Sequence, residues 1–186
     1  MVTLASLWLP IVVSAVAVFV ASAILWMVLP YHRKDWRGVT NEPALNDAIR
    51  AQNLGGGMYM FPHCGSPAEM KEPANVERFK RGPWGTLILH GRMPSMGRAL
   101  TQWFIHLLIV SLLVGYLATL TLGAGADYRA VFRIVSTSAF LAYSMGMVAG
   151  SIWEGKPWSF TAKHMFDGLI YALLTAGIFG WRWPHA

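Results

Sequence analysis

The stretch FDGLIYALLTAGIFGWRW, residues 166–183, decides how the rest of the chain is interpreted. It is apolar enough to cross a membrane, and it holds one acid, Asp167, near its start. Small residues recur in it at every fourth position: Gly168, Ala172, Ala176 and Gly180. Such a stripe lets two helix backbones approach closely in lipid, where dispersion contacts must hold helices together. The stretch therefore predicts a tightly packed membrane helix that must also accommodate one acid.

The composition of the whole chain also indicates a membrane protein. Of its 186 residues, 55% are hydrophobic and 13% are charged, whereas a soluble domain has about 25% charged residues. The nine Trp residues agree, because Trp prefers the boundary between hydrocarbon and lipid headgroups. Membrane topology explains the net charge of +6 better than nucleic acid does, because the basic residues are not interleaved with aromatic ones. The single cysteine, Cys64, excludes an internal disulfide.

Four apolar segments are long enough to span a bilayer: about residues 7–29, 100–122, 131–150 and 165–183. The first holds no charged residue, and its length exceeds the ~20 residues that a membrane helix needs. Short links at 123–130 and 151–164 make consecutive helices antiparallel neighbours. The sequence thus predicts an all-α fold, an integral membrane four-helix bundle that residues 1–186 form as a single membrane domain.

A polar connector, residues 31–99, separates the first two spans. It holds ten of the 15 Lys and Arg residues, and basic residues are retained on the cytoplasmic side of a membrane. We therefore expect the connector to lie in the cytoplasm and both termini to lie outside it.

Short regular elements are expected within this connector. Residues 41–53 predict an amphipathic helix with a polar cap at residues 40–41. Residues 58–61 and 86–90 are β-prone and predict a small hairpin, which needs the bundle or a partner to be stable. A further helix is expected around residues 68–80.

The connector also places His63 beside Cys64. Neighbouring side chains on an extended strand point to opposite faces, so this pair suits catalysis only if a turn bends it or His90 supplies the second group. The three glycines at 55–57 lack the flanking pattern of a phosphate loop. No catalytic residue is therefore predicted, and the sequence favours a protein that is not an enzyme.

The third span carries small residues at the same spacing as the stretch at 166–183. We expect the third and fourth spans to pack closely through these two stripes. The predicted packing residues are Gly146, Gly150, Gly168, Ala172, Ala176 and Gly180.

Asp167 needs an explanation, because an acid at mid-bilayer costs about 2.5–3.5 kcal/mol on insertion scales. A structural role is the leading interpretation: a helix N-terminus favours an acid, and Lys163 or Lys156 could pair with it. The alternative is a carrier of protons, ions or small solutes whose path Asp167 and Tyr171 line.

A second alternative is a haem or metal site. His106, His164 and Asp167 could bind a divalent metal, and paired histidines could ligate haem. His32, at the end of the first span, is expected at a similar depth. No resident cofactor is the leading prediction, with haem or a divalent metal as this alternative.

Three motifs carry a resemblance to a known family. They are NEPALNDAIR (41–50), FPHCGSPAEM (61–70) and FDGLIYALLTAGIFGWRW (166–183). With them, most of the chain resembles a family of small, functionally uncharacterised bacterial four-span membrane proteins. The resemblance implies a bacterial inner membrane and the same spans, but no catalytic or binding residue.

The packing stripes and the lack of a catalytic motif favour a non-catalytic accessory or assembly subunit of a larger membrane complex. Its expected partners are the lipid bilayer and other membrane subunits or further copies of itself, and not nucleic acid. The sequence has no evident inverted repeat or broken helix, which counts against a complete transporter.

Overall fold

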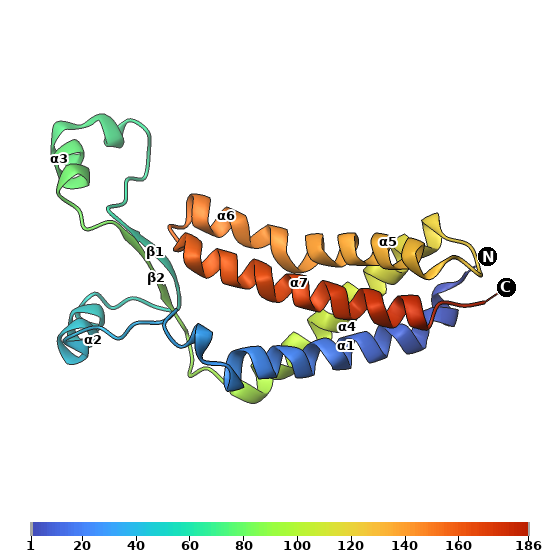
Figure 1. Ribbon diagram of the computed structural model, residues 1–186. Coiled ribbons are helices and arrows are strands. Elements are labelled where there is room, and N and C mark those ends of the chain that lie inside the picture. Colours follow the sequence, from blue (N-terminus) through green and yellow to red (C-terminus); the bar gives the residue numbers. More distant parts are fainter. Residues whose placement is uncertain (1, 186) are drawn as a thin grey trace. The chain divides into compact units, whose positions relative to one another are not determined.

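The computed structural model describes residues 2–185, which divide into two units (Figure 1). Unit 1 joins the residues up to Arg37 with those from Met96 onward. Unit 2 is Gly38–Ser95. Unit 2 coincides with the predicted connector, residues 31–99, except at the ends of that range.

Long helical segments lie side by side in unit 1 (Figure 1). The helices are α1 (Trp8–Ala23), α4 (Met96–Thr121), α5 (Tyr128–Phe140), α6 (Gly146–Trp153) and α7 (Trp158–Trp181). A π turn at Ile24–Val28 follows α1, and a second at Leu141–Met145 joins α5 to α6. Local chemistry sets two of the starts: the Asp127 side chain accepts a hydrogen bond from the Arg129 amide, and Pro157 immediately precedes α7.

Three helical segments of the described chain are long and apolar enough to cross a membrane: Leu4–Val28, Met96–Thr121 and Tyr128–Trp153. They coincide with the first three predicted spans. Helices of this length and apolar composition indicate a membrane-embedded protein. Helix α7 covers the predicted fourth span, residues 165–183, except for its last two residues. Helix α7 is not among these three segments, and its first half carries Lys163, His164 and Asp167.

The interior of unit 1 is built around α7. This helix packs against α1 and α5, and α4 packs against the same two helices. Leu7, Val114 and Phe179 form part of the apolar interior, and each is at most 2% exposed. Gly115 of α4 permits this packing, because a Cβ atom there would lie 3.2 Å from the Phe179 ring.

Both ends of the chain lie at one end of unit 1 (Figure 1). Val2 and Trp183 belong to the same apolar cluster, and the Trp183 indole donates a hydrogen bond to the Gly123 carbonyl at 2.9 Å. The Gly125 amide donates to the Pro184 carbonyl at 2.8 Å. The helical segments therefore traverse unit 1 an even number of times.

The small residues of α7 lie at helix contacts. Both alanines of the stripe are fully buried. A Cβ atom at Gly168 would lie 2.1 Å from Ser144 Oγ, and one at Gly180 would lie 2.6 Å from the Tyr128 ring. Since Ser144 and Tyr128 belong to the segment that runs from α5 to α6, this face of α7 packs against the third predicted span.

The place predicted for Gly146 is wrong. Gly146 is exposed, and a Cβ atom there would meet no atom within 4 Å, while Gly150 lies against the Lys156 side chain. The buried face of α5 instead carries Val131, Val135 and Ala139. The π turn then adds a residue to the helical turn, and Ser144 meets α7 in place of Gly146.

Unit 2 contains the short elements expected of the connector. They are α2 (Glu42–Ala51), β1 (Gly57–Phe61), α3 (Pro73–Arg81) and β2 (Gly85–Leu89). The Asn41 side chain caps α2 by accepting a hydrogen bond from the Ala44 amide at 3.1 Å. Strands β1 and β2 pair antiparallel, with Tyr59 opposite Leu87. The predicted short helix and the predicted hairpin are both confirmed.

Candidate functional site

Five polar side chains gather near the start of α7, and we call them the Asp167 cluster. Its members are Tyr31, His32, Asp35, Lys163 and Asp167. A short 3-10 turn, Pro30–His32, follows the first π turn and carries Tyr31 and His32. Lys163 and Asp167 lie four residues apart on α7 and therefore on one face of that helix.

Both carboxylate oxygens of Asp167 are engaged. The Tyr31 hydroxyl donates a hydrogen bond to Oδ1, and His32 Nε2 lies 2.9 Å from Oδ2. The other ring nitrogen of His32, Nδ1, lies 2.6 Å from Asp35 Oδ2. Asp167 is 2% exposed and His32 is 4% exposed. His32 therefore bridges two carboxyl groups that are shielded from water.

The predicted lysine partners of Asp167 are wrong. The Lys163 ammonium donates to the Asp35 carboxylate, and Lys156 pairs with Glu154 at 2.7 Å. A lysine keeps its charged end near water, and Asp35 offers Lys163 a carboxylate while Lys163 remains 29% exposed. Asp167 is more deeply buried, and its hydrogen-bond partners are Tyr31 and His32.

Asp35 joins the cluster to the more exposed lysine. Burial raises the pKa of Asp35, but the hydrogen bonds and charges of Lys163 and His32 outweigh it and hold that pKa below its usual value. Lys163 also donates to the Tyr31 carbonyl at 2.6 Å. The segment after α1 is thereby tied to α7 by both side-chain and backbone groups.

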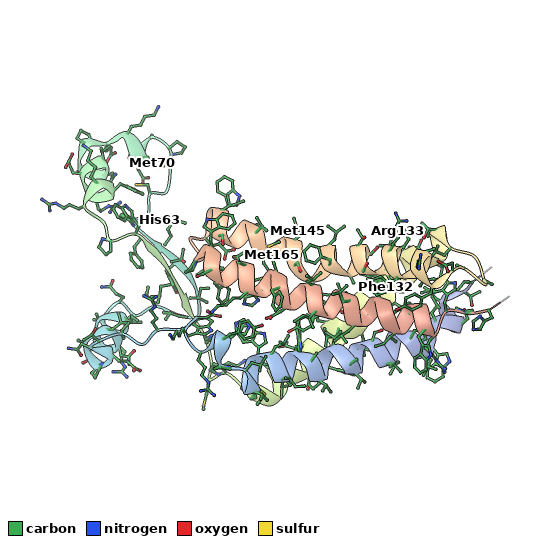
Figure 2. All side chains as sticks on the ribbon, viewed as in Figure 1. His63, Met70, Phe132, Arg133, Met145 and Met165 are labelled. Carbon is green, nitrogen blue, oxygen red and sulfur yellow. The ribbon has the colours of Figure 1, made fainter. Side chains whose placement is uncertain are left out.

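Both π turns of unit 1 lie against this region. Trp26, in the first π turn, stacks on His32 with ring centroids 3.9 Å apart and planes 10° apart. Ser144, in the second, donates from its hydroxyl to the Met165 carbonyl at 3.4 Å. Met165 and nearby Met145 are labelled at this level of the helices in Figure 2. Because π turns are rare and concentrate at functional sites, their position here marks the cluster as a candidate site.

Buried hydroxyl groups continue from the cluster into unit 1. Tyr171 lies one turn beyond Asp167 on α7, is 4% exposed, and its ring centroid is 5.7 Å from that of Tyr143. Ser14 of α1 and Ser111 of α4 are fully buried. Among the described residues, these four hydroxyl groups have no hydrogen-bond partner. Buried hydroxyl groups of this kind are usually bonded to water, so this part of the interior is polar.

The two predicted histidine ligands have different surroundings. The ring centroid of His164 is 5.8 Å from that of His32, and its buried Nε2 has no hydrogen-bond partner within the described chain. His106 stacks on Trp103 with ring centroids 5.4 Å apart. Within residues 2–185, no three His, Cys, Asp or Glu side chains are grouped to hold a metal ion. The haem or metal hypothesis therefore stays a prediction.

Sequence reasoning missed two members of the cluster, Tyr31 and Asp35. The signal lay in YHRKD, residues 31–35, directly after the first span. Its Arg and Lys residues indicate topology, but no local pattern shows that the tyrosine and the acid beside them face α7. The expected depth of His32 agrees with its contact to Asp167.

Unit 2 exposes an apolar sheet face. No residue of Gly38–Ser95, all of which the structure describes, is buried. Met58 and Ile88 lie opposite each other on the two strands and are 68% and 56% exposed. Met60 lies two residues from Met58, hence on the same face, and is 57% exposed. A two-stranded sheet is marginally stable alone, so this face is suited to being covered.

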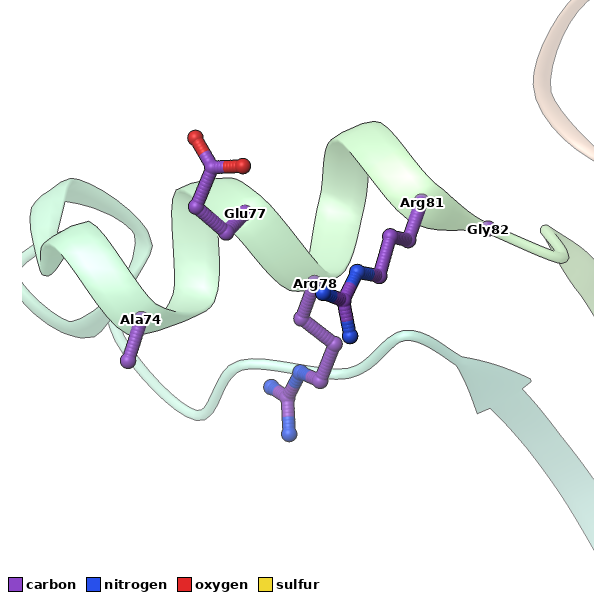
Figure 3. Close-up of a pocket in the computed structure, with 5 residues that line it drawn as sticks. All are labelled: Ala74, Glu77, Arg78, Arg81 and Gly82. Atoms are coloured by element: carbon purple, nitrogen blue, oxygen red, sulfur yellow. The ribbon is translucent and has the colours of Figure 1, made fainter.

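A shallow pocket of about 280 Å³ lies on α3 (Figure 3). Its lining residues are Ala74, Glu77, Arg78, Arg81 and Gly82, none of them buried. Figure 3 shows Arg78 and Arg81 on the same side of the helix. Arg78 is engaged by the neighbouring loop, since it donates to the His63 carbonyl at 2.7 Å and lies 3.6 Å from the Cys64 sulfur. The pocket lacks the convergent buried polar groups of a ligand site.

Comparison with protein-family models, with curated proteins and with solved structures finds no match to this chain. Its function is therefore inferred from its own residues.

Proposed function

We propose that the protein is a multispanning, non-catalytic subunit of a larger membrane complex and that unit 2 binds its partner. The observation that carries this proposal is the exposed apolar face of Met58, Met60 and Ile88. Continuous exposed apolar surface is typical of interaction sites. The partner in this proposal is another membrane protein that packs apolar side chains of its own against this face.

In this proposal α7 is the fourth span of a bacterial inner-membrane protein. The helix has 24 residues, against the ~20 that a span requires. Its acid and the lysine four residues earlier lie in the first half of the helix, and both have protein partners. The basic residues of the connector favour a cytoplasmic position for unit 2 and an external one for both termini.

Co-purification in mild detergent tests the binding role of unit 2. The change Ile88→Lys places a charge on the apolar face, and it disturbs no buried residue because Ile88 is 56% exposed. We expect the recovery of proteins that co-purify with the unchanged chain to fall about tenfold, which corresponds to ~1.4 kcal/mol of binding free energy.

The matched control is Leu45→Lys, because Leu45 is 42% exposed on α2 of the same unit. This variant is expected to retain the same co-purifying proteins. Equal losses in both variants, or an unchanged chain that purifies without other proteins or further copies, would contradict the proposal.

A haem or metal protein is the second candidate, and the unpartnered Nε2 of His164 is the observation that favours it. An optical spectrum and a metal analysis of the purified protein distinguish the two candidates. A Soret band or a stoichiometric metal that disappears in His164→Ala would favour the second candidate over an accessory role.

A further inference from the structure

Hydrogen-bond chemistry fixes the number of protons in the Asp167 cluster. An ionised carboxylate can only accept hydrogen bonds, and a neutral imidazole carries a single N–H. Both ring nitrogens of His32 lie against carboxyl oxygens, at 2.6 Å from Asp35 and 2.9 Å from Asp167. With a neutral ring and two ionised acids, one of these contacts would join two lone pairs. Both contacts are favourable only when one additional proton resides on His32 or on Asp167.

Charge balance requires the same proton. With it, His32 and Lys163 offset the two carboxylates, and the cluster is neutral. Without it, a net negative charge would remain among side chains that are at most 5% exposed, apart from Lys163, which is costly. Since Lys163 holds Asp35 ionised, the proton is shared by His32 Nε2 and Asp167 Oδ2. Tyr31 is the fifth, titratable member of the cluster, and the titratable groups around it are His164, Tyr171, Tyr143 and, next to His164, Lys156.

The cluster reaches the surface of unit 1 at Lys163. The Lys163 side chain is 29% exposed, whereas that of Asp35 is 5% exposed and that of Asp167 is 3% exposed. Lys163 donates a hydrogen bond to Asp35, whose carboxylate also accepts one from His32 Nδ1, and His32 Nε2 is hydrogen-bonded to Asp167. The exposure of the side chains therefore decreases from Lys163, at the surface, to Asp167, in the interior.

Polar groups continue inward from Asp167 but end inside unit 1. Tyr171 comes first, and the buried hydroxyl groups of Tyr143, Ser14 and Ser111 also lie in the interior. In the described chain, no buried polar side chain lies nearer the end with both termini than Ser14 on α1, Ser111 on α4 and Thr175 on α7. Apolar residues fill that half of unit 1, and we call Leu7, Val114 and Phe179 the apolar plug.

We propose that the Asp167 cluster is a proton-binding site with access from only one side of the membrane. A proton from water on the Lys163 side enters the cluster, changes its net charge from negative to neutral, and is shared between His32 and Asp167. The apolar plug prevents its passage to the other side. This role is independent of assembly: the protein binds a proton while the membrane stays sealed.

The ring nitrogens of His32 report the proton directly. In protein labelled with 15N-histidine at neutral pH, we expect His32 to show two protonated ring nitrogens or one nitrogen that shares its proton with Asp167. The change Asp167→Asn removes the acid that shares the proton and is expected to convert His32 to a neutral ring with one N–H. A neutral, single-tautomer His32 beside an ionised Asp167 in the unchanged protein would overturn the proposal.

Proteoliposomes with an internal pH indicator test the apolar plug. Vesicles with the unchanged protein are expected to hold a pH gradient as well as empty vesicles do. Phe179→Ser, or Val114→Ser if the first variant does not fold, is expected to dissipate the gradient about tenfold faster. Adding Asp167→Asn to either variant is expected to restore the slow rate.

The control for the plug is Leu173→Ser, because Leu173 is 43% exposed on the outer side of α7. It is expected to leave the gradient intact. A folded plug variant without a leak, or a leak that persists after Asp167→Asn, would contradict a proton site closed by this plug.

Discussion

At the scale of single residues, Gly168 is where α7 comes closest to its neighbour. A Cβ atom there would lie 2.1 Å from Ser144 Oγ and 3.3 Å from the Tyr143 carbonyl carbon. The Ser144 hydroxyl could rotate away, but the backbone of Tyr143 could not. A side chain at this position must therefore separate the two helices.

Gly168→Ala is expected to lower the free energy of unfolding by about 1–3 kcal/mol, the usual cost of overpacking. Gly146→Ala is the matched control, because Gly146 is also helical but faces open space. Its stability should stay the same or rise by up to ~1 kcal/mol, the helix-propensity difference. Unfolding of both variants in mixed micelles, followed by circular dichroism, measures the difference. Equal effects of the two changes would show that Gly168 is not a packing position.

At the scale of elements, the two π turns determine which residues face α7. Apolar runs in the sequence are sufficient to predict three membrane-crossing segments, and small residues every fourth position predict a packing face on α7. Neither signal shows that Leu141–Met145 (LAYSM) winds as a π turn, because this segment has no Gly or Pro to mark it. The predicted stripe with Gly146 is wrong for this reason, together with the larger residues that α5 buries.

Deleting Ala142 is expected to remove this π turn and let α5 continue directly into α6. Because the π turn holds one residue more than a regular turn, this deletion should leave α6 near its present orientation and keep the buried bond between the Ser151 and Thr161 hydroxyl groups, now 2.6 Å apart. Deleting Ala149, an exposed residue of the regular helix α6, should instead rotate the residues after it by about 100° and break that bond. We expect the Ala149 deletion to lower the unfolding free energy by ~2 kcal/mol or more and the Ala142 deletion to lower it by less. Thermal unfolding in detergent compares the two, and equal losses would refute the role given to the π turn.

At the scale of the whole molecule, the sequence predicts local structure well and distant pairing poorly. The helix after Asn41 and the small hairpin follow from caps and residue preferences within short segments. The contact of Tyr31 with Asp167 joins residues 136 positions apart, and no local pattern connects them. The spacing of Lys163 and Asp167 along one helix favours their pairing, but the turn after α1 supplies His32 as the partner instead.

The topology is open to a direct test, because Cys64 is the only cysteine and lies in unit 2. With unit 2 in the cytoplasm, a membrane-impermeant maleimide should label Cys64 after the cells are permeabilised but not in intact cells. Thr3→Cys in a Cys64→Ser background is the control and should be labelled in intact cells, because the N-terminus is expected outside. Labelling of Cys64 in intact cells would reverse the orientation.

The bridge from His32 to Asp167 also has a consequence for synthesis. The two residues are 135 positions apart, so at ~5–20 residues per second the ribosome needs roughly 7–27 s to proceed from one to the other. During that interval α1 and α4 are already in the bilayer, but α7 is not yet made. His32 and Asp35 therefore lack their contacts with Asp167 and Lys163. Nascent chains that stop before α7 would present these unpaired groups to membrane proteases, so the last helix made is the one that completes the fold.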